Sequence, residues 1–129
     1  MKMQGRKICT GTAEGEIIAT KDGISFYGGI DPKTGIVLEK GHELEGKSVA
    51  GKILVFPQGK GSTVGSYVLY NLKKNGKAPL AIVNKECETI VAVGCIISEI
   101  PCIDRIEIEK LQTGMKAKLN AEQGTLETE

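Results

Sequence analysis

Residues 52–83 contain two short apolar runs separated by a glycine-rich turn and an amphipathic stretch. The first run, residues 52–56, is short and ends at Pro57, which predicts a buried strand. In residues 64–74 apolar side chains recur four apart along one side, which predicts a helix. The run at residues 79–83 predicts another strand. A strand, a helix and a strand in this order form a parallel crossover, so we expect an α/β fold.

The flanking segments carry weaker patterns. Residues 8–20 alternate on either side of Glu14–Gly15 and predict a β-hairpin with its turn there. Residues 86–96 combine β-branched residues with acidic side chains at their start, and we favour a second crossover helix over a strand. That helix would lead to a strand near residues 101–103. Residues 114–126 alternate polar and apolar side chains, which predicts a strand, a turn and a last short strand.

The composition sets limits on the class of protein. The 129 residues fit a single domain, residues 1–129, that is large enough to bury a core. The 17 Lys and Arg side chains balance 16 Asp and Glu, for a net charge of +1. This balance argues against binding to nucleic acid or to a membrane surface, which needs a basic excess. No apolar run reaches membrane-spanning length and no export signal is recognisable, so we expect a cytoplasmic protein.

The four cysteines are Cys9, Cys87, Cys95 and Cys102. No two of them have the two-residue gap of a zinc or iron–sulfur loop, and the acidic residues show no metal-ligand spacing. In a cytoplasmic chain such cysteines are expected to be reduced and to act as small buried hydrophobic residues. The sequence therefore predicts no metal and no cofactor in this chain.

The turn between the predicted strand and the predicted helix contains Gly59, Lys60, Gly61, Ser62 and Thr63. A helix N-terminus offers N–H groups and the positive end of the helix dipole, so it attracts anions. Lys60 adds a positive charge, and the two glycines allow the backbone to approach a ligand closely. A carboxylate or a phosphate is the expected ligand. Alternatively, Ser62 or Thr63 would only cap the helix, since both residue types are good N-caps.

Familiar glycine and nucleophile motifs do not match this turn. A P-loop requires a glycine where Leu54 stands, and a dinucleotide fingerprint requires its third glycine one residue before Gly65. No nucleophile-elbow pattern surrounds Ser62, which argues against a hydrolase triad. The one histidine, His42, is expected to be a loop or edge residue rather than a base. Asp31 is expected to be a turn former, or else a residue that lines the site.

Five segments carry a more specific signal. They are YGGIDPKTG at residues 27–35, VAGKILVFP at 49–57, GKGS at 59–62, GSYVL at 65–69 and APLAIV at 78–83. Together they resemble the small subunit of the aconitase X family, and the resemblance extends over most of residues 8–105.

This resemblance implies the swivelling β/β/α domain of aconitases. Such a domain has a small parallel sheet with helices on one face and a second, mostly antiparallel sheet. The resemblance also implies a heterodimer, in which a large catalytic subunit carries a [4Fe–4S] cluster and most of the substrate ligands. The implied reaction is the dehydration of (R)-5-phosphomevalonate, a phosphorylated small hydroxy acid, to trans-anhydromevalonate 5-phosphate in an isoprenoid pathway.

The resemblance implies roles for individual residues as well. Ser62 matches the position of a general base, and Lys60 with the helix N-terminus would stabilise its alkoxide. The leaving hydroxyl would be activated by the cluster on the partner. Thr63 is an alternative to Ser62, because the family loop continues with further Ser or Thr residues where this chain has Val64. The expected substrate-binding residues are Gly59, Lys60, Gly61, Thr63, Gly29 and Asp31.

Two alternatives are left open. Within the family, the substrate would be another small hydroxy acid, such as a hydroxyproline. Outside enzyme function, the chain would be a non-catalytic, anion-binding module that assembles with a partner. Replacement of Ser62 by alanine in the reconstituted complex distinguishes catalysis from assembly, and the identity of the partner distinguishes the substrates.

Overall fold

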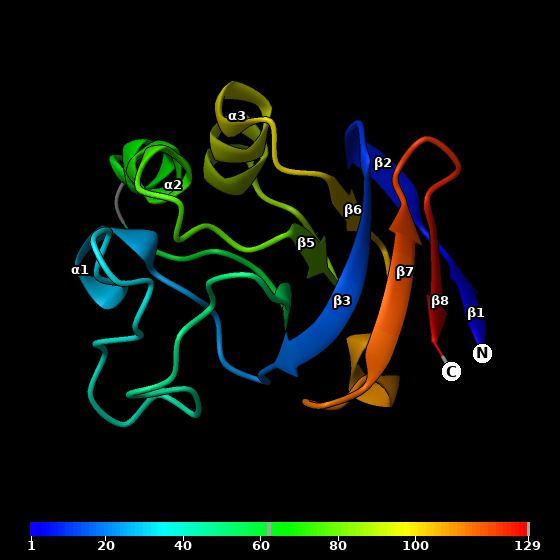
Figure 1. Ribbon diagram of the computed structural model, residues 1–129, viewed down its shortest axis with the longest axis horizontal. Helices are drawn as coiled ribbons and strands as arrows, with labels where there is room; N and C mark the ends of the chain where they lie inside the picture. The colour runs from blue at the N-terminus through cyan, green and yellow to red at the C-terminus, as the bar shows by residue number, and fades with distance from the viewer. Residues whose placement is uncertain (62, 129) are drawn as a thin grey trace.

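The computed structural model describes residues 1–61 and 63–128, in which one mixed sheet has helices on one side (Figure 1). The sheet has eight strands in the order β1-β8-β7-β3-β4-β5-β6-β2. The strands are β1 (Lys2–Gln4), β2 (Arg6–Cys9), β3 (Thr12–Ala19), β4 (Ile53–Phe56), β5 (Ala81–Asn84), β6 (Cys102–Asp104), β7 (Lys116–Asn120) and β8 (Thr125–Thr128). The helices are α1 (Phe26–Gly29), α2 (Gly65–Lys74), α3 (Thr89–Ser98) and the 3-10 helix η1 (Ile108–Lys110).

Strand β3 joins a parallel part of the sheet to an antiparallel part. Its second half pairs in parallel with β4, with Ile17 opposite Ile53, and β5 and β6 continue this parallel arrangement. Its first half pairs in antiparallel orientation with β7, which is followed by β8 and β1. The expected combination of a parallel sheet with a mostly antiparallel one is confirmed, and the two are continuous through β3.

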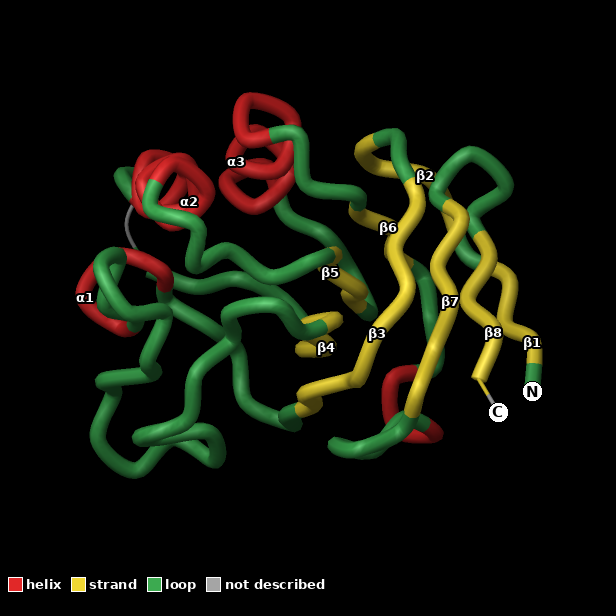
Figure 2. The backbone as a smooth tube through the Cα atoms, in the orientation of Figure 1, coloured by secondary structure: helices red, strands yellow, loops and turns green. Residues whose placement is uncertain are grey.

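The sheet and the helices form three layers with an apolar core in each gap. Helices α1, α2 and α3 lie on one side of the parallel strands, whereas η1 and the antiparallel strands lie on the other (Figure 2). Alternate residues of β4 supply both cores. Leu54 and Phe56 pack under the helices, and Ile53 and Val55 pack under the antiparallel strands. Burial on both faces explains why the apolar run of β4 is unbroken.

Most of the predicted elements are confirmed. The crossover over residues 52–83 is β4, α2 and β5, and the helix favoured over residues 86–96 is α3, which leads to β6. The C-terminal alternating segment is β7 and β8, which pair with each other. At the start of α3 the Glu88 carboxylate accepts a hydrogen bond from the Val91 N–H at 3.0 Å. The acidic side chain therefore acts as the N-cap that a helix requires.

The predicted hairpin over residues 8–20 is wrong. Strand β2 pairs with β6 and not with β3, and the connection between β2 and β3 passes through Gly11, where φ is +133°. Glu14 and Gly15 lie inside β3 and pair with β7. A Cβ atom at Gly15 would lie 2.8 Å from Leu80 Cδ1. Gly15 is therefore a position of close packing within a strand, and its glycine does not mark a turn.

Helices α2 and α3 approach each other closely at Gly94. A Cβ atom there would lie 2.5 Å from Leu69 Cδ1 and 3.2 Å from Ser66 Cα. In an isolated helix, Gly→Ala stabilises by about 1 kcal/mol, but here the helices would have to separate. We expect Gly94→Ala to lower the free energy of unfolding by about 1–3 kcal/mol, as measured by urea denaturation. A variant more stable than the native chain would show that the contact is not tight.

Candidate functional site

The glycine loop, residues 58–63, connects the end of β4 to α2. Its first half is held by backbone hydrogen bonds to Ile24, which donates its N–H to the Gln58 carbonyl at 3.2 Å and accepts from the Lys60 N–H at 2.9 Å. The carboxyl ends of parallel strands are where α/β proteins usually bind ligands. Ser62, the predicted catalytic residue, lies outside the described residues.

Gly59 lies against the first turn of α3. A Cβ atom at Gly59 would be 2.6 Å from Val91 Cγ2 and 2.8 Å from Glu88 Oε1. Only glycine therefore fits without displacing the carboxylate that caps α3. Because that carboxylate occupies the start of α3, the start of α2 is the helix end beside the loop that is suited to a ligand anion.

Ser25 and Gly29 lie beside the glycine loop. Gly61 has a φ of +94°, and a Cβ atom there would be 2.6 Å from Ser25 Oγ. The Ser25 hydroxyl donates a hydrogen bond to the Tyr27 carbonyl at 3.0 Å. A Cβ atom at Gly29 would lie 3.5 Å from Ser25 Cβ. Two predicted site residues from distant parts of the sequence, Gly29 and Gly61, therefore meet at Ser25.

Lys60 forms an ion pair with Glu39. The Lys60 Nζ and Glu39 Oε2 atoms are 3.0 Å apart, and the two side chains are 49% and 33% exposed. A Cβ atom at Gly29 would be 3.8 Å from Glu39 Oε1, so this carboxylate also borders the site. An ion pair this exposed contributes at most about 1 kcal/mol. An anionic ligand could therefore replace Glu39 as the partner of Lys60 at little cost.

The start of α2 does not use Thr63 as its cap. The helix begins at Gly65 and Val64 occupies the N-cap position, so the capping role considered for Thr63 is wrong. Thr63 is exposed, and its carbonyl accepts a hydrogen bond from the Ser66 hydroxyl at 3.3 Å. The same alternative for Ser62 falls outside the described residues. Thr63 thus presents a hydroxyl-bearing side chain next to the helix end.

Asp31 is a turn former. Its side-chain Oδ1 accepts from the Lys33 N–H at 2.9 Å, and its carbonyl accepts from the Gly35 N–H at 2.7 Å. The hydrogen bonds of the Asp31 carboxylate within the described residues stay inside this turn. The expected turn-forming role is therefore the one that the hydrogen bonds support, whereas Gly29, two residues earlier, lies against Ser25 beside the glycine loop.

His42 is held in a loop by two backbone contacts. Its Nδ1 accepts a hydrogen bond from the Leu44 N–H at 3.0 Å, so its Nε2 carries the proton and donates to the Gly23 carbonyl at 3.0 Å. The side chain is 6% exposed. Because both ring nitrogens are engaged, His42 is a structural loop residue, as the sequence suggested.

The four cysteines are all free and lie near one another. Cys9, Cys95 and Cys102 are buried and Cys87 is half-buried. The Cys87 and Cys102 sulfurs are 4.0 Å apart, and Cys9 Sγ is 3.6 Å from the Cys95 carbonyl. The contact with the Cys102 thiol and burial raise the pKa of Cys87, and burial raises that of Cys9. Although these side chains are close, no three His, Cys, Asp or Glu side chains among the described residues are arranged so that they could hold a metal ion.

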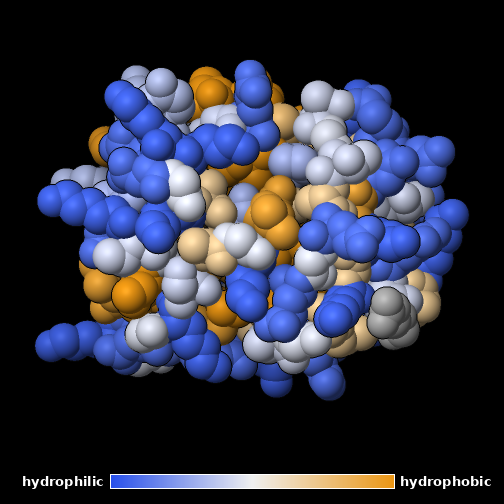
Figure 3. All heavy atoms as spheres, in the orientation of Figure 1, coloured by the Kyte–Doolittle hydropathy of each residue, from blue (hydrophilic) through white to orange (hydrophobic). Residues whose placement is uncertain are grey.

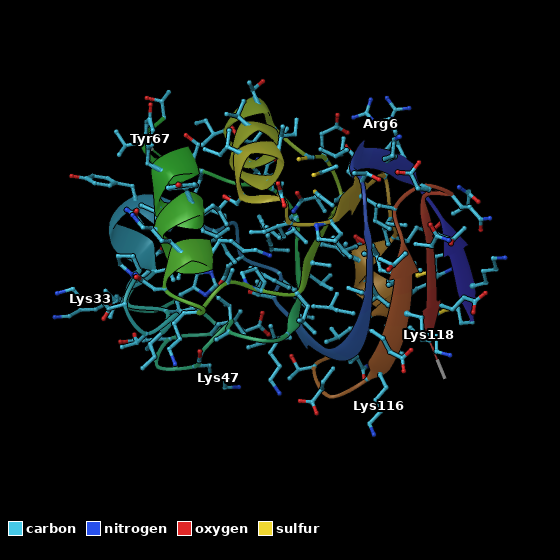
Figure 4. The ribbon with its side chains drawn as sticks, turned by 45° about the horizontal axis from the view of Figure 1, so that its top comes forward. Arg6, Lys33, Lys47, Tyr67, Lys116 and Lys118 are labelled. Carbon is cyan, nitrogen blue, oxygen red and sulfur yellow. The ribbon has the colours of Figure 1, made fainter. Side chains whose placement is uncertain are left out.

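An open groove of about 580 Å³ lies at the ends of β3 and β4, and none of its lining residues belongs to the glycine loop. Its charged side chains largely have partners within the chain. Lys85 pairs with Glu109 at 3.1 Å, and the Lys21 N–H donates to Glu43 at 2.8 Å, a bond that lowers the pKa of Glu43. Lys47, at its rim, points away from the body of the molecule (Figure 4). Mixed, paired charges select no ligand, so the glycine loop is the better candidate site.

Sequence reasoning missed three residues that shape this site, Ser25, Glu39 and Glu88. Each comes from a segment that the backbone brings to the glycine loop from elsewhere in the chain. Glu88 carried a signal, because an acidic residue just before an apolar helix is a usual N-cap. Ser25 and Glu39 carried no such signal.

Within the part of the chain that the structure describes, no helix is both long and apolar enough to cross a membrane.

Residues 2–128 match the family described as the aconitase X swivel domain. The chain is 58% identical over 127 residues to the phosphomevalonate dehydratase small subunit of Thermococcus kodakarensis, with 98% of this chain and 96% of the relative covered. It is 58% identical over 130 residues to the protein of the same name from Methanosarcina acetivorans, with 98% and 90% covered.

Two solved structures share the fold. The crystal structure of Thermococcus kodakaraensis aconitase X in its holo form matches with a TM-score of 0.99 at 56% identity, covering 100% of this chain and 98% of the other. A solution NMR structure of a UPF0107 protein matches with a TM-score of 0.92 at 55% identity, covering 100% and 99%. Sequence and fold agree over the whole chain, which therefore belongs to the aconitase X swivel domain family.

Proposed function

We propose that this chain is the small subunit of a hydro-lyase that dehydrates (R)-5-phosphomevalonate to trans-anhydromevalonate 5-phosphate. The observation that carries the proposal is the sequence identity to relatives from Thermococcus and Pyrococcus that are named phosphomevalonate dehydratase small subunit. The identity is 50–58%, and the matches cover 95–98% of the length of these relatives. The placement of the glycine loop between β4 and α2 supports it, because an anionic substrate suits that helix end. In this proposal residues 1–129 form one swivel domain that acts in an isoprenoid pathway. The proposed compartment is the cytoplasm, where cysteines are usually free, as they are in this chain.

The reaction removes a proton from the carbon next to the substrate carboxylate and a hydroxide from the neighbouring carbon, which together leave as water. We assign the proton to Ser62, acting as general base. The N-terminus of α2 and the ammonium group of Lys60 favour the alkoxide form of a serine in this loop. Thr63 is exposed beside the helix end and is the alternative base. Activation of the leaving hydroxyl is assigned to the large subunit, where a [4Fe–4S] cluster would act as a Lewis acid.

The proposed substrate contacts come from two loops. Gly59, Gly61 and Gly29 are the proposed backbone contacts. The lack of a side chain at each of them also allows the chain to pack closely against Glu88 or Ser25. Lys60 provides the charge and Thr63 a hydroxyl. Asp31 contributes through the turn that it holds, which sets the path of the chain after Gly29.

The decisive experiment reconstitutes the chain with its large subunit and supplies (R)-5-phosphomevalonate. Proton NMR should show a new vinylic signal, with each subunit alone as the control. We expect turnover only with both polypeptides. A complex that dehydrates a hydroxyproline and leaves phosphomevalonate unchanged would favour the other substrate class. A complex that binds phosphate-containing ligands without any turnover would favour the non-catalytic module.

The ion pair between Lys60 and Glu39 allows a paired test of substrate binding. If Lys60 binds an anionic group of the substrate, Lys60→Ala should raise KM by about 10-fold or more, because a charge-assisted hydrogen bond is lost. Glu39→Gln keeps the shape and removes the competing carboxylate, so its KM should stay equal or fall. Steady-state kinetics of the reconstituted complex measures both. Equal KM values for the native and Lys60→Ala complexes would remove Lys60 from the site.

A further inference from the structure

Exposed apolar side chains gather on the outer sides of α2 and α3. Tyr67 and Tyr70 of α2 are 64% and 45% exposed, and Val93, Ile96 and Ile97 of α3 are 43%, 57% and 44% exposed. We refer to these residues as the helix-pair surface. Tyr67 projects from α2 away from the sheet (Figure 4), and hydrophobic atoms lie at the edge of the molecule over α3 (Figure 3).

The two helices form one continuous surface because they are in direct contact. Gly94 of α3 packs on Ser66 and Leu69 of α2. Tyr67 follows Ser66 in the sequence and Tyr70 follows Leu69. Each tyrosine is therefore rotated by one residue around the helix from a contact residue, and it faces solvent. Val93 precedes Gly94 on the corresponding outer side of α3. The tyrosines and the aliphatic side chains therefore flank the same helix–helix seam.

Helix α3 is unusual for a helix at a protein surface. Its sequence, TIVAVGCIIS, has no charged residue, whereas an exposed helix normally carries charged side chains on its outer face. A helix that is apolar on all sides is typically buried in a larger structure. The outer face of α3 is thus suited to contact with another polypeptide.

The position of the surface identifies that polypeptide. The first turn of α3 contacts the glycine loop, through Val91 and Glu88 against Gly59. The start of α2 contacts the same turn, where a Cβ atom at Gly65 would be 3.4 Å from Ile90 Cγ2. A partner that completes the site at the glycine loop therefore reaches the helix-pair surface directly.

We propose that the helix-pair surface is the docking surface for the large subunit of the complex, an inference that rests on the proposed function. A stable interface buries about 800 Å² on each partner, which is about an eighth of the 6511 Å² surface of this chain. The tyrosines supply the aromatic anchors that dominate the energetics of such interfaces. The aliphatic side chains of α3 supply the apolar centre.

The test measures the dissociation constant between the full-length chain and its large subunit. Ile96→Lys and, separately, Tyr67→Ala should each weaken binding by about 30-fold or more. Leu80→Lys is the matched control, since Leu80 is 40% exposed but lies beside Gly15 of β3, away from the helix pair. Its dissociation constant should stay within about 3-fold of the native value. Thermal melting of each variant confirms that it is folded, and Tyr67→Ala removes no buried group.

Two results would overturn the proposal. One is a native-like dissociation constant for both Ile96→Lys and Tyr67→Ala. The other is concentration-dependent self-association of the chain that Ile96→Lys abolishes while binding to the large subunit persists, since the occupant would then be a second copy. The dehydration assay keeps this question separate from the proposed function. A native complex that binds tightly but does not dehydrate phosphomevalonate contradicts the function alone, and an active complex that is insensitive to these substitutions contradicts the surface alone.

Discussion

Replacement of Ser62 by alanine should lower the turnover number of the reconstituted complex by at least about 100-fold, with little change in KM. The reason is that a general base acts in the transition state, so its removal leaves substrate binding almost intact. Steady-state kinetics with (R)-5-phosphomevalonate measures both constants. Substrate affinity should instead depend on Lys60, whose ammonium group forms an ion pair with the partly exposed Glu39.

Two further variants separate catalysis from capping. If Ser62 only stabilised the helix, Ser62→Ala would cost about 1 kcal/mol of unfolding free energy and leave turnover near normal. Ser62→Gly retains most of the capping preference and removes the hydroxyl, so the proposed role predicts the same loss of turnover for it. Thr63→Val is the matching test of the alternative base, because it removes the hydroxyl and keeps the branched shape of the side chain. Near-normal turnover for Ser62→Gly, with a large loss for Thr63→Val, would transfer the base to Thr63.

The central crossover could be predicted from the sequence because its signals are local. Residues of β4 are buried on both faces, so an apolar run bounded by Pro57 was sufficient to identify the strand. The helix stripe and the stop at Asn75 and Gly76 identified α2 in the same way. The prediction of a hairpin over residues 8–20 failed because Gly15, the expected turn residue, lies inside a strand where close packing requires a glycine. The contact of Gly15 with Leu80 joins residues far apart in sequence, and no local pattern reports it.

The candidate site also contains residues that could be predicted from the sequence and residues that could not. The glycine loop and its charge were visible in the sequence, because a strand, glycines and a helix follow one another. Its neighbours Ser25 and Glu39 were not, since they reach the loop only when the segments after β3 fold over it. The exposed face of α3 also lacked a clear signal. Val93, Ile96 and Ile97 resemble core residues by composition, and only their exposure indicates a contact with a partner.

The largest expected loss of stability comes from Phe56, the last residue of β4. Its side chain is fully buried and its ring lies edge-on to that of Phe26, with centroids 5.9 Å apart and planes at 68°. Phe56→Ala should lower the free energy of unfolding by about 3–5 kcal/mol, since it opens a cavity and removes an aromatic pair. Urea denaturation of the isolated chain measures the loss.

A conservative variant tests whether the aromatic pair itself matters. Phe56→Leu keeps most of the buried volume, so it should cost less than Phe56→Ala, and a double-mutant cycle with Phe26→Leu should give a coupling of about 0.5–1.5 kcal/mol. A coupling near zero would mean that the rings contribute only by filling space. The pair is of interest beyond stability because the glycine loop begins at Gln58, two residues after Phe56, and α1 begins at Phe26. Loosening this contact should therefore disturb the two backbone segments that meet at Ser25, and with them the position of Lys60.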